Sequence, residues 1–148
     1  MKFVLDCSAG IGMARHLDEA LPCRYALAEG PREVLAPTLL YAEAGSTMAK
    51  YVKAGVYDQE TAGRFVDAVV SVPDTFVEME DLYEEAFFEA LHLNHSIYDM
   101  FYFVLARRNA ATLLTLDKRL NALCEREGVG CIHEVHVPSL EEEPSQDA

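Results

Sequence analysis

The clearest structural signal in this chain is the apolar run Ala111-Thr112-Leu113-Leu114-Thr115-Leu116. Its length, its β-branched residues and its lack of charge predict a buried β-strand. A helix is predicted directly after it, from Lys118 to Glu127, because Gly128 is a typical helix stop. A buried strand that leads into a helix is the unit from which parallel α/β sheets are built.

The same alternation extends outward from this run along the rest of the chain. Further strands are predicted at Lys2–Leu5, at Glu33–Ala36 and around Phe76-Val77, and a last one begins at Cys131-Ile132. Helices are predicted over residues 38–53, 58–70, 81–91 and 96–108, from apolar spacing and from capping residues such as Asp58. We therefore predict an α/β fold, a sandwich with a mostly parallel central sheet flanked by helices.

The length of 148 residues suffices for one domain and is too short to expect two. Residues 1–138 are predicted to form this domain, and 139–148, which include four acids, an acidic and disordered tail. No apolar run approaches the roughly 20 residues that a membrane span requires. The first residues lead into a strand and do not resemble a signal peptide. We expect a cytoplasmic protein with no membrane partner.

The net charge of −13, from 25 acids and 12 bases, limits the possible partners. Such a surface repels nucleic acid at long range, which counts against a general RNA- or DNA-binding protein. Any hypothesis of a nuclease must therefore explain where the acids lie.

Two aspartates follow predicted strands directly, Asp6 after the first and Asp117 after the fourth. Because ligands of parallel sheets bind at the carboxyl ends of the strands, we expect both side chains at the same edge. A simpler interpretation exists for each, since Asp6 and Asp117 can cap the helices that follow them. Asp99 also fits a capping box that begins at Ser96. Taken singly, each of the three is more simply a helix cap than a catalytic residue.

Glu43 is harder to explain by a structural role. It lies in the middle of a predicted helix among apolar and small residues, and no basic residue lies three or four positions away. A carboxylate on such a face is costly to bury unless it meets a cation. A metal ion would satisfy this requirement.

Three aspartates and one helical glutamate can converge on a divalent cation. Mg²⁺ and Mn²⁺ prefer oxygen ligands and keep several waters, so carboxylates without histidine or cysteine suit them. Such an ion can activate water and stabilise the charge that develops on a phosphodiester. Clustered carboxylates also repel one another, so at least one raised pKa is expected in the metal-free site.

Four sequence blocks carry a resemblance to a known family. They are Val4-Leu5-Asp6-Cys7-Ser8-Ala9, the stretch from Ala36 to Glu43, the stretch from Ser96 to Ala106, and the stretch from Leu113 to Leu120. In this order and spacing, the chain resembles the PIN-domain nucleases, and most closely the VapC-type toxins of bacterial toxin–antitoxin pairs. The resemblance covers the whole chain except the acidic tail.

The resemblance implies a PIN-like three-layer sandwich, a homodimer and an RNA substrate, with a cognate antitoxin as partner. It makes Asp6, Glu43, Asp99 and Asp117 the catalytic quartet that binds Mg²⁺ (or Mn²⁺), with the hydroxyls of Ser8 and Thr115 around it. One departure is Ser46, where the family often has Asn three residues after the glutamate. It keeps a polar group on the same face with a shorter reach.

Other polar and aromatic residues have competing interpretations. Lys118 and Arg119 follow Asp117 and are possible phosphate contacts, although solvated helix-end charges would look the same. His92 and His95 are interpreted as exposed loop histidines. The aromatic run from Tyr98 to Phe103 could stack on bases, but core or dimer interface is the more common role of such a stripe.

The sequence thus favours a metal-dependent endoribonuclease that acts as a toxin. A housekeeping RNA-processing nuclease of the same fold is the first alternative. A non-catalytic acidic module, in which the acids only cap helices, is another. A phospho-receiver domain fits less well, because the region after the third predicted strand offers neither the aspartate nor the lysine that it requires.

Overall fold

The structure is a computed structural model, and it describes residues 1–132. The central sheet has four parallel strands in the order β3-β2-β1-β4. They are β1 (Lys2–Leu5), β2 (Glu33–Pro37), β3 (Thr75–Val77) and β4 (Thr112–Leu114). The helices are α1 (Cys7–Ala14), α2 (Leu21–Ala28), α3 (Leu39–Lys53), α4 (Gln59–Val70), α5 (Tyr83–His92), α6 (Ile97–Arg108) and α7 (Lys118–Glu127). Two short 3-10 turns, Asp18–Ala20 and Met79–Asp81, precede α2 and α5.

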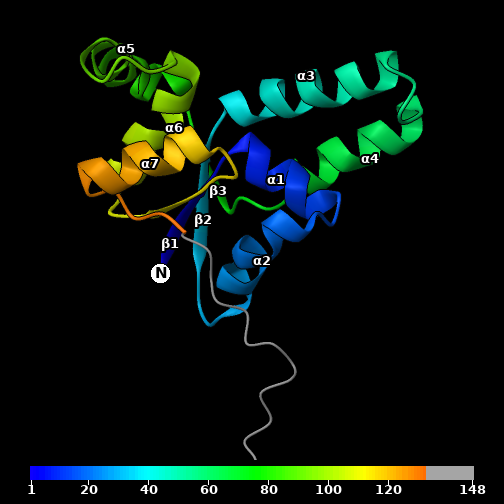
Figure 1. Cartoon of the computed structure of the whole chain (residues 1–148), viewed down its shortest axis with the longest axis horizontal. Helices are drawn as coiled ribbons and strands as arrows, with labels where there is room; N and C mark the ends of the chain where they lie inside the picture. The colour runs from blue at the N-terminus through cyan, green and yellow to red at the C-terminus, as the bar shows by residue number, and fades with distance from the viewer. Residues whose placement is uncertain (133–148) are drawn as a thin grey trace, which may run out of the picture.

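The sheet separates two groups of helices, with α5, α6 and α7 on one face and α1, α2, α3 and α4 toward the other (Figure 1). Alternate strand residues pack against opposite groups, as the pleat of a strand requires. Val4 contributes to the core on the α6 side, while its neighbours Phe3 and Leu5 contribute to the core on the α1 side. The predicted three-layer α/β sandwich with a parallel central sheet is thereby confirmed.

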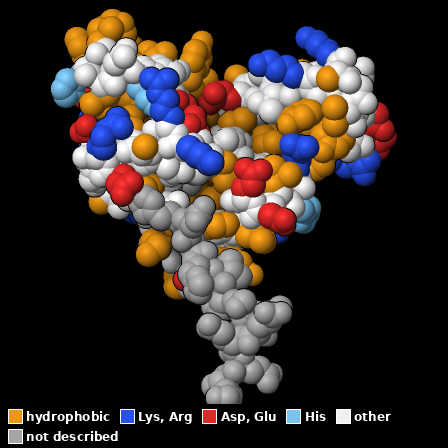
Figure 2. All heavy atoms as spheres, in the orientation of Figure 1, with side chains coloured by type: hydrophobic (Ala, Val, Ile, Leu, Met, Phe, Trp, Pro, Cys, Tyr) orange, Lys and Arg blue, Asp and Glu red, His pale blue; other side chains and the backbone are white. Residues whose placement is uncertain are grey.

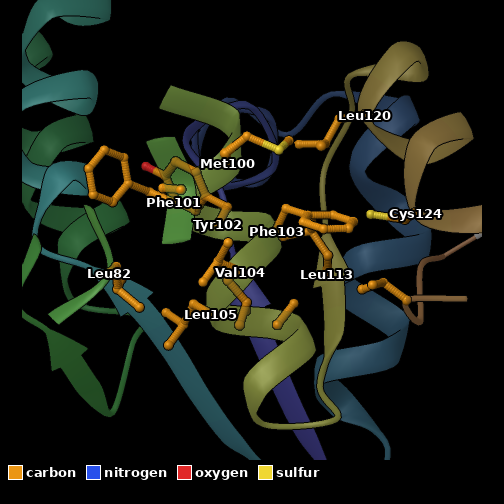
Figure 3. Packing of buried hydrophobic residues seen from close by; sticks show 14 of the residues in the cluster. Leu82, Met100, Phe101, Tyr102, Phe103, Val104, Leu105, Leu113, Leu120 and Cys124 are labelled. Atoms are coloured by element: carbon orange, nitrogen blue, oxygen red, sulfur yellow. The ribbon is translucent and has the colours of Figure 1, made fainter. Parts of the chain in front are cut away.

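Helix α6 forms the centre of one core. Seven consecutive residues, Met100 to Ala106, are buried, so this helix is apolar on every side. Figure 3 shows Phe103 directed toward Leu113 of β4 and Cys124 of α7. A helix enclosed in this way has a fixed orientation, and the polar residues in its first turns are positioned by it.

Helix α1 packs closely because it contains two glycines without side chains. A Cβ atom on Gly10 would lie 2.7 Å from Val69 of α4, and one on Gly12 would lie 2.5 Å from Leu116, which follows β4. Both distances are shorter than van der Waals contact allows. The glycines therefore let α1 lie against α4 and the segment after β4.

Some predicted boundaries change in the structure. Strand β4 is shorter than the predicted 111–116, because the backbone of Thr115 no longer pairs with a strand and its carbonyl accepts from Asn121 Nδ2 at 3.0 Å. The helix predicted over 81–91 begins at Tyr83, after the 3-10 turn. At Cys131 the described chain makes a single parallel bridge to Leu113. Helix α2, with Pro22 near its start, was not predicted.

The predicted division at residue 138 lies outside the described residues and stays a prediction. No described helix is both long and apolar enough to cross a membrane.

Candidate active site

The four carboxylates of the predicted quartet line one pocket of about 370 Å³. Asp6 follows β1 and Asp117 follows β4, while Glu43 projects from α3 and Asp99 from α6. Figure 2 shows acidic side chains at the hollow between α3 and the α5–α6 side of the molecule. Segments separated by up to 111 residues in the sequence thus bring their acids to the carboxyl edge of the sheet.

Asp6 and Asp117, the strand-end pair, are held by backbone amides. Asp6 Oδ1 accepts hydrogen bonds from Ala9 N at 2.9 Å and from Ser8 Oγ at 2.8 Å. Asp117 Oδ1 accepts from the backbone nitrogens of Arg119 at 2.9 Å and Leu120 at 3.3 Å. Both aspartates are therefore N-caps, as the simpler interpretation predicted, and they also line the pocket.

The hydroxyls of Ser8 and Thr115 connect the ends of β1 and β4. Their oxygens lie 3.2 Å apart. Ser8 Oγ accepts from Leu116 N at 2.9 Å, and Thr115 Oγ1 accepts from Asp117 N at 3.1 Å. Both hydroxyls thus lie beside the strand-end pair, and the role around a metal ion that the resemblance implies for them stays a prediction.

Glu43 and Asp99, the helix pair, are held by side chains. The Tyr102 hydroxyl donates to Glu43 Oε1 at 2.6 Å, and His95 Nε2 lies 2.8 Å from Asp99 Oδ2. The capping-box interpretation of Asp99 is wrong, since Ser96 makes no side-chain cap bond and Asp99 interacts with His95. Tyr102 and Asp99 lie one helical turn apart on α6, so they face the same side.

His95 was predicted to be exposed, and this is wrong. Its side chain is 5% exposed, whereas that of His92 is 74% exposed, as predicted. Asn94 adopts a left-handed backbone conformation with φ of 50°, which ends α5 and redirects the chain. His95 then lies just before α6, four residues from Asp99, with its ring buried against the pocket wall.

The pocket raises the pKa of three of its carboxyl groups. Burial raises the pKa of Asp6 from 3.8 to about 6, against the lowering effect of its hydrogen bonds. Burial also raises the pKa of Glu43, although the Tyr102 hydrogen bond lowers it, and the charge of Asp99 raises it further. The pKa of Asp99 is raised by burial, lowered by His95 and raised again by Asp117. The expected raised pKa is thus present, and a bound cation would favour the charged forms.

The donor set fits a hard divalent cation. Glu43 Oε2, Asp99 Oδ1 and Asp117 Oδ2 accept no hydrogen bond from residues 1–132, so each can face a ligand. However, among these residues no three histidine, cysteine or acidic side chains lie close enough together to hold a metal ion directly. Mg²⁺ is commonly bound through one or two carboxylates with several retained waters, which suits a spread-out set of oxygens.

The other predicted residues lie outside this pocket. Ser46 lines a neighbouring hollow together with Glu43 and Lys50. Lys118 and Arg119 are exposed and do not line the pocket, although the Arg119 side chain reaches the Asn94 carbonyl at 3.4 Å. Their role as phosphate contacts stays a prediction.

Sequence reasoning missed several residues that belong to the pocket or hold its acids, among them Tyr102, His95 and Arg15. Tyr102 was grouped with the core, and its position three residues after Asp99 was the available signal. His95 lies four residues before the same aspartate. Arg15 lines the pocket with the quartet, and nothing in its local sequence indicates this.

Comparison with known proteins shows the fold. No family model and no curated protein sequence matches this chain. Among solved structures, PAE2754 of Pyrobaculum aerophilum has a TM-score of 0.65 and 24% identity over 82% of this chain and 84% of its own. VapC20 of Mycobacterium tuberculosis, described as a Sarcin-Ricin loop cleaving toxin, has a TM-score of 0.62 and 16% identity over 82% and 94%. VapBC2 of Rickettsia felis, solved with promoter DNA, has a TM-score of 0.60 and 16% identity over 89% and 98%.

Proposed function

We propose that this chain, which has the PIN-type fold of VapC toxins, is an endoribonuclease that depends on Mg²⁺ or Mn²⁺. The observation that carries the proposal is the convergence of Asp6, Glu43, Asp99 and Asp117 in one pocket at the carboxyl edge of the sheet. Helix caps alone do not require such convergence, and neither Glu43 nor Asp99 caps a helix. VapC20, a structural neighbour, is described as cleaving the Sarcin-Ricin loop, which supports RNA as the substrate class.

The four carboxylates would hold a hydrated cation, in part through the waters that it retains. When bound, the ion would supply activation of water and stabilisation of charge on the phosphodiester. The side chains of the chain itself orient the ligand oxygens. Backbone amides fix Asp6 and Asp117, and the Tyr102 hydroxyl and the His95 ring fix Glu43 and Asp99. Partners that orient ligand oxygens in this way commonly affect metal affinity or activity by 10–100-fold.

The toxin role and the antitoxin partner are part of the same proposal. Two structural neighbours are VapBC proteins, from Rickettsia felis and from nontypeable Haemophilus influenzae. A chain of net charge −13 is suited to attract a positively charged partner. We place the protein in the cytoplasm, where RNA and such a partner would meet it.

A homodimer is the proposed assembly, and α5 offers a surface for it. Tyr83, Phe87 and Leu91 follow one another at helical spacing and are 57%, 50% and 68% exposed, with Phe88 beside them at 60%. Figure 2 shows hydrophobic side chains gathered over this part of the molecule. Burial of this stripe against a second copy would remove it from water.

Cleavage of single-stranded RNA by the purified chain with Mn²⁺, compared with the Asp99→Asn variant, tests the enzyme. The variant keeps the shape of the side chain and removes a ligand charge, so cleavage should stop while the thermal melt of the fold is retained. Asp58→Asn is the matched control, because Asp58 is an N-cap of α4 outside the pocket. Normal cleavage by Asp99→Asn would exclude the quartet as the catalytic centre.

The toxin role is tested by expression of the chain alone and with the product of its upstream gene. Slow growth that the co-expressed protein relieves supports a toxin. Harmless expression of active nuclease, without a co-purifying small protein, supports the housekeeping alternative.

A further inference from the structure

The pocket extends beyond the carboxylates along the seam between α1 and α3. On α1 it runs from Asp6, the N-cap, to Arg15, the C-cap, and on α3 from Glu43 to Tyr51. Nine residues of helical rise separate Asp6 from Arg15, which corresponds to roughly 13 Å. The pocket therefore has two chemically different ends, one acidic and one formed by Arg15 and Tyr51.

Arg15 is held in a fixed orientation by two tyrosines. Its Nη1 donates to the Tyr51 hydroxyl at 2.8 Å, and its Nε donates to the Tyr57 hydroxyl at 3.1 Å. The guanidinium carbon lies 4.7 Å from the centre of the Tyr51 ring, within cation–π distance. Its Nη2 makes no hydrogen bond to residues 1–132 and is available to a ligand.

Among residues 1–132, no acid forms an ion pair with Arg15. Arg64, Arg107 and Arg108, by contrast, all pair with glutamates. Its acceptors are neutral phenols, and each phenol that accepts from Arg15 keeps its own proton to donate. It is also the sole lysine or arginine among the residues that line the described pocket.

We propose that Arg15, oriented by Tyr51 and Tyr57, binds a backbone phosphate of single-stranded RNA a few nucleotides from the phosphate that is cleaved. The guanidinium fork, with Nη2 left available, matches the oxygens of a phosphate. This inference rests on the proposed ribonuclease function and adds a binding role to it. Arg15 would bind the substrate away from the reacting phosphate, because it lies at the opposite end of the pocket from the four carboxylates.

The test measures binding of a fluorescein-labelled single-stranded RNA by fluorescence anisotropy, in an Asp99→Asn background that does not cleave. Arg15→Gln should weaken binding about tenfold, as expected for loss of a charged hydrogen bond. The slope of log K against log salt should become shallower by about 0.7, the value for one phosphate contact of a single strand. Arg15→Lys should leave the salt slope unchanged and lose part of the RNA affinity, since lysine keeps the positive charge but lacks the guanidinium fork.

Arg64→Gln is the matched control, because it removes the same charge from an exposed residue of α4 that pairs with Glu60. It should leave the affinity and the slope unchanged. In the cleaving enzyme, Arg15→Gln should raise KM more than it lowers kcat, since this phosphate is held equally in the ground state and the transition state.

Three results would overturn the inference alone, in a protein that binds and cleaves RNA. The first is an equal salt slope in Arg15→Gln and Arg64→Gln. The second is a lower affinity of Arg15→Gln that accompanies a lower melting temperature while the salt slope stays unchanged. That result would show that Arg15 has a structural role. The third is unchanged RNA binding with weaker binding of a partner protein. Absence of RNA binding and cleavage by the unmodified chain would instead overturn the proposed function together with this inference.

Discussion

The strand-end pair and the helix pair line the same pocket but are held by different means. Asp6 and Asp117 accept hydrogen bonds from backbone amides at the first turns of α1 and α7. Glu43 and Asp99 depend on single side chains, Tyr102 and His95. The positions of the first pair therefore follow mainly from the main chain of the fold, with Ser8 Oγ as an additional donor to Asp6. Those of the second pair can be changed by one substitution that leaves the backbone in place.

The largest effect is expected from Asp6→Asn, which removes a charge of the strand-end pair and keeps the cap. Cleavage should fall by more than about a hundredfold, because changes to residues that only support metal ligands already cost 10–100-fold. Mn²⁺ should raise the melting temperature of the unmodified chain through linkage, and this rise should disappear in the variant. An equal rise in both proteins would remove Asp6 from the metal site.

The second prediction concerns the pH dependence of stability without metal. Because burial raises the pKa of Asp6 from 3.8 to about 6, the folded state retains a proton that the unfolded state releases in this range. The free energy of unfolding should therefore fall as pH rises from 3.8 through 6, by up to roughly 3 kcal/mol from this group. Chemical denaturation with a chelator present, compared between the chain and Asp6→Asn, isolates the contribution of Asp6.

At pH 7 and without metal, Asp6→Asn should thus be the more stable of the two proteins. The pKa values of Glu43 and Asp99 are also raised, so the helix pair adds to the fall of stability with rising pH in both proteins. A variant that follows the same pH curve as the parent would mean that the pKa of Asp6 does not differ between the folded and unfolded states.

The third prediction moves to the helix pair. His95→Phe keeps a buried ring of similar size and removes the nitrogen that meets Asp99. Cleavage or Mn²⁺ affinity should fall by 10–100-fold, as for other residues that orient metal ligands. His95→Gln keeps a hydrogen-bond donor and should therefore lose less activity than His95→Phe. His92→Phe, at an exposed position, serves as the control. If His95→Phe cleaves normally, Asp99 does not need this partner.

The smallest effect is expected from Tyr102→Phe, which deletes one hydroxyl. Glu43 then loses its neutral donor, and stability should fall by about 1 kcal/mol, the typical net value of a hydrogen bond. Cleavage should fall by no more than about tenfold, at the low end for a ligand-orienting group. Tyr98→Phe is the control, because that side chain is 58% exposed. A loss as large as that of Asp6→Asn would show that the Tyr102 hydroxyl matters to cleavage as much as a carboxylate of the quartet.

The same contrast explains how much of the site could be predicted. The apolar run before Asp117 and the short strand before Asp6 place both aspartates at one sheet edge, since parallel strands end together. The partners of the helix pair could not be found in this way. The positions of Tyr102 and His95 depend on the left-handed turn at Asn94 and on how α6 is rotated relative to α3. Tertiary packing determines both of these features. Arg15 was missed for the same reason.

Helix α1 links the two ends of the pocket and has a fixed length. Its two glycines let the helix pack directly against α4 and Leu116, since a Cβ atom at either position would lie within 3 Å of a neighbouring side chain. One inserted residue would advance Arg15 by about 1.5 Å and rotate it by about 100° away from the seam. In the proposed ribonuclease, the eight residues Cys7–Ala14 would therefore set the interval, along a bound strand of RNA, between the phosphate that Arg15 holds and the bond that is cut.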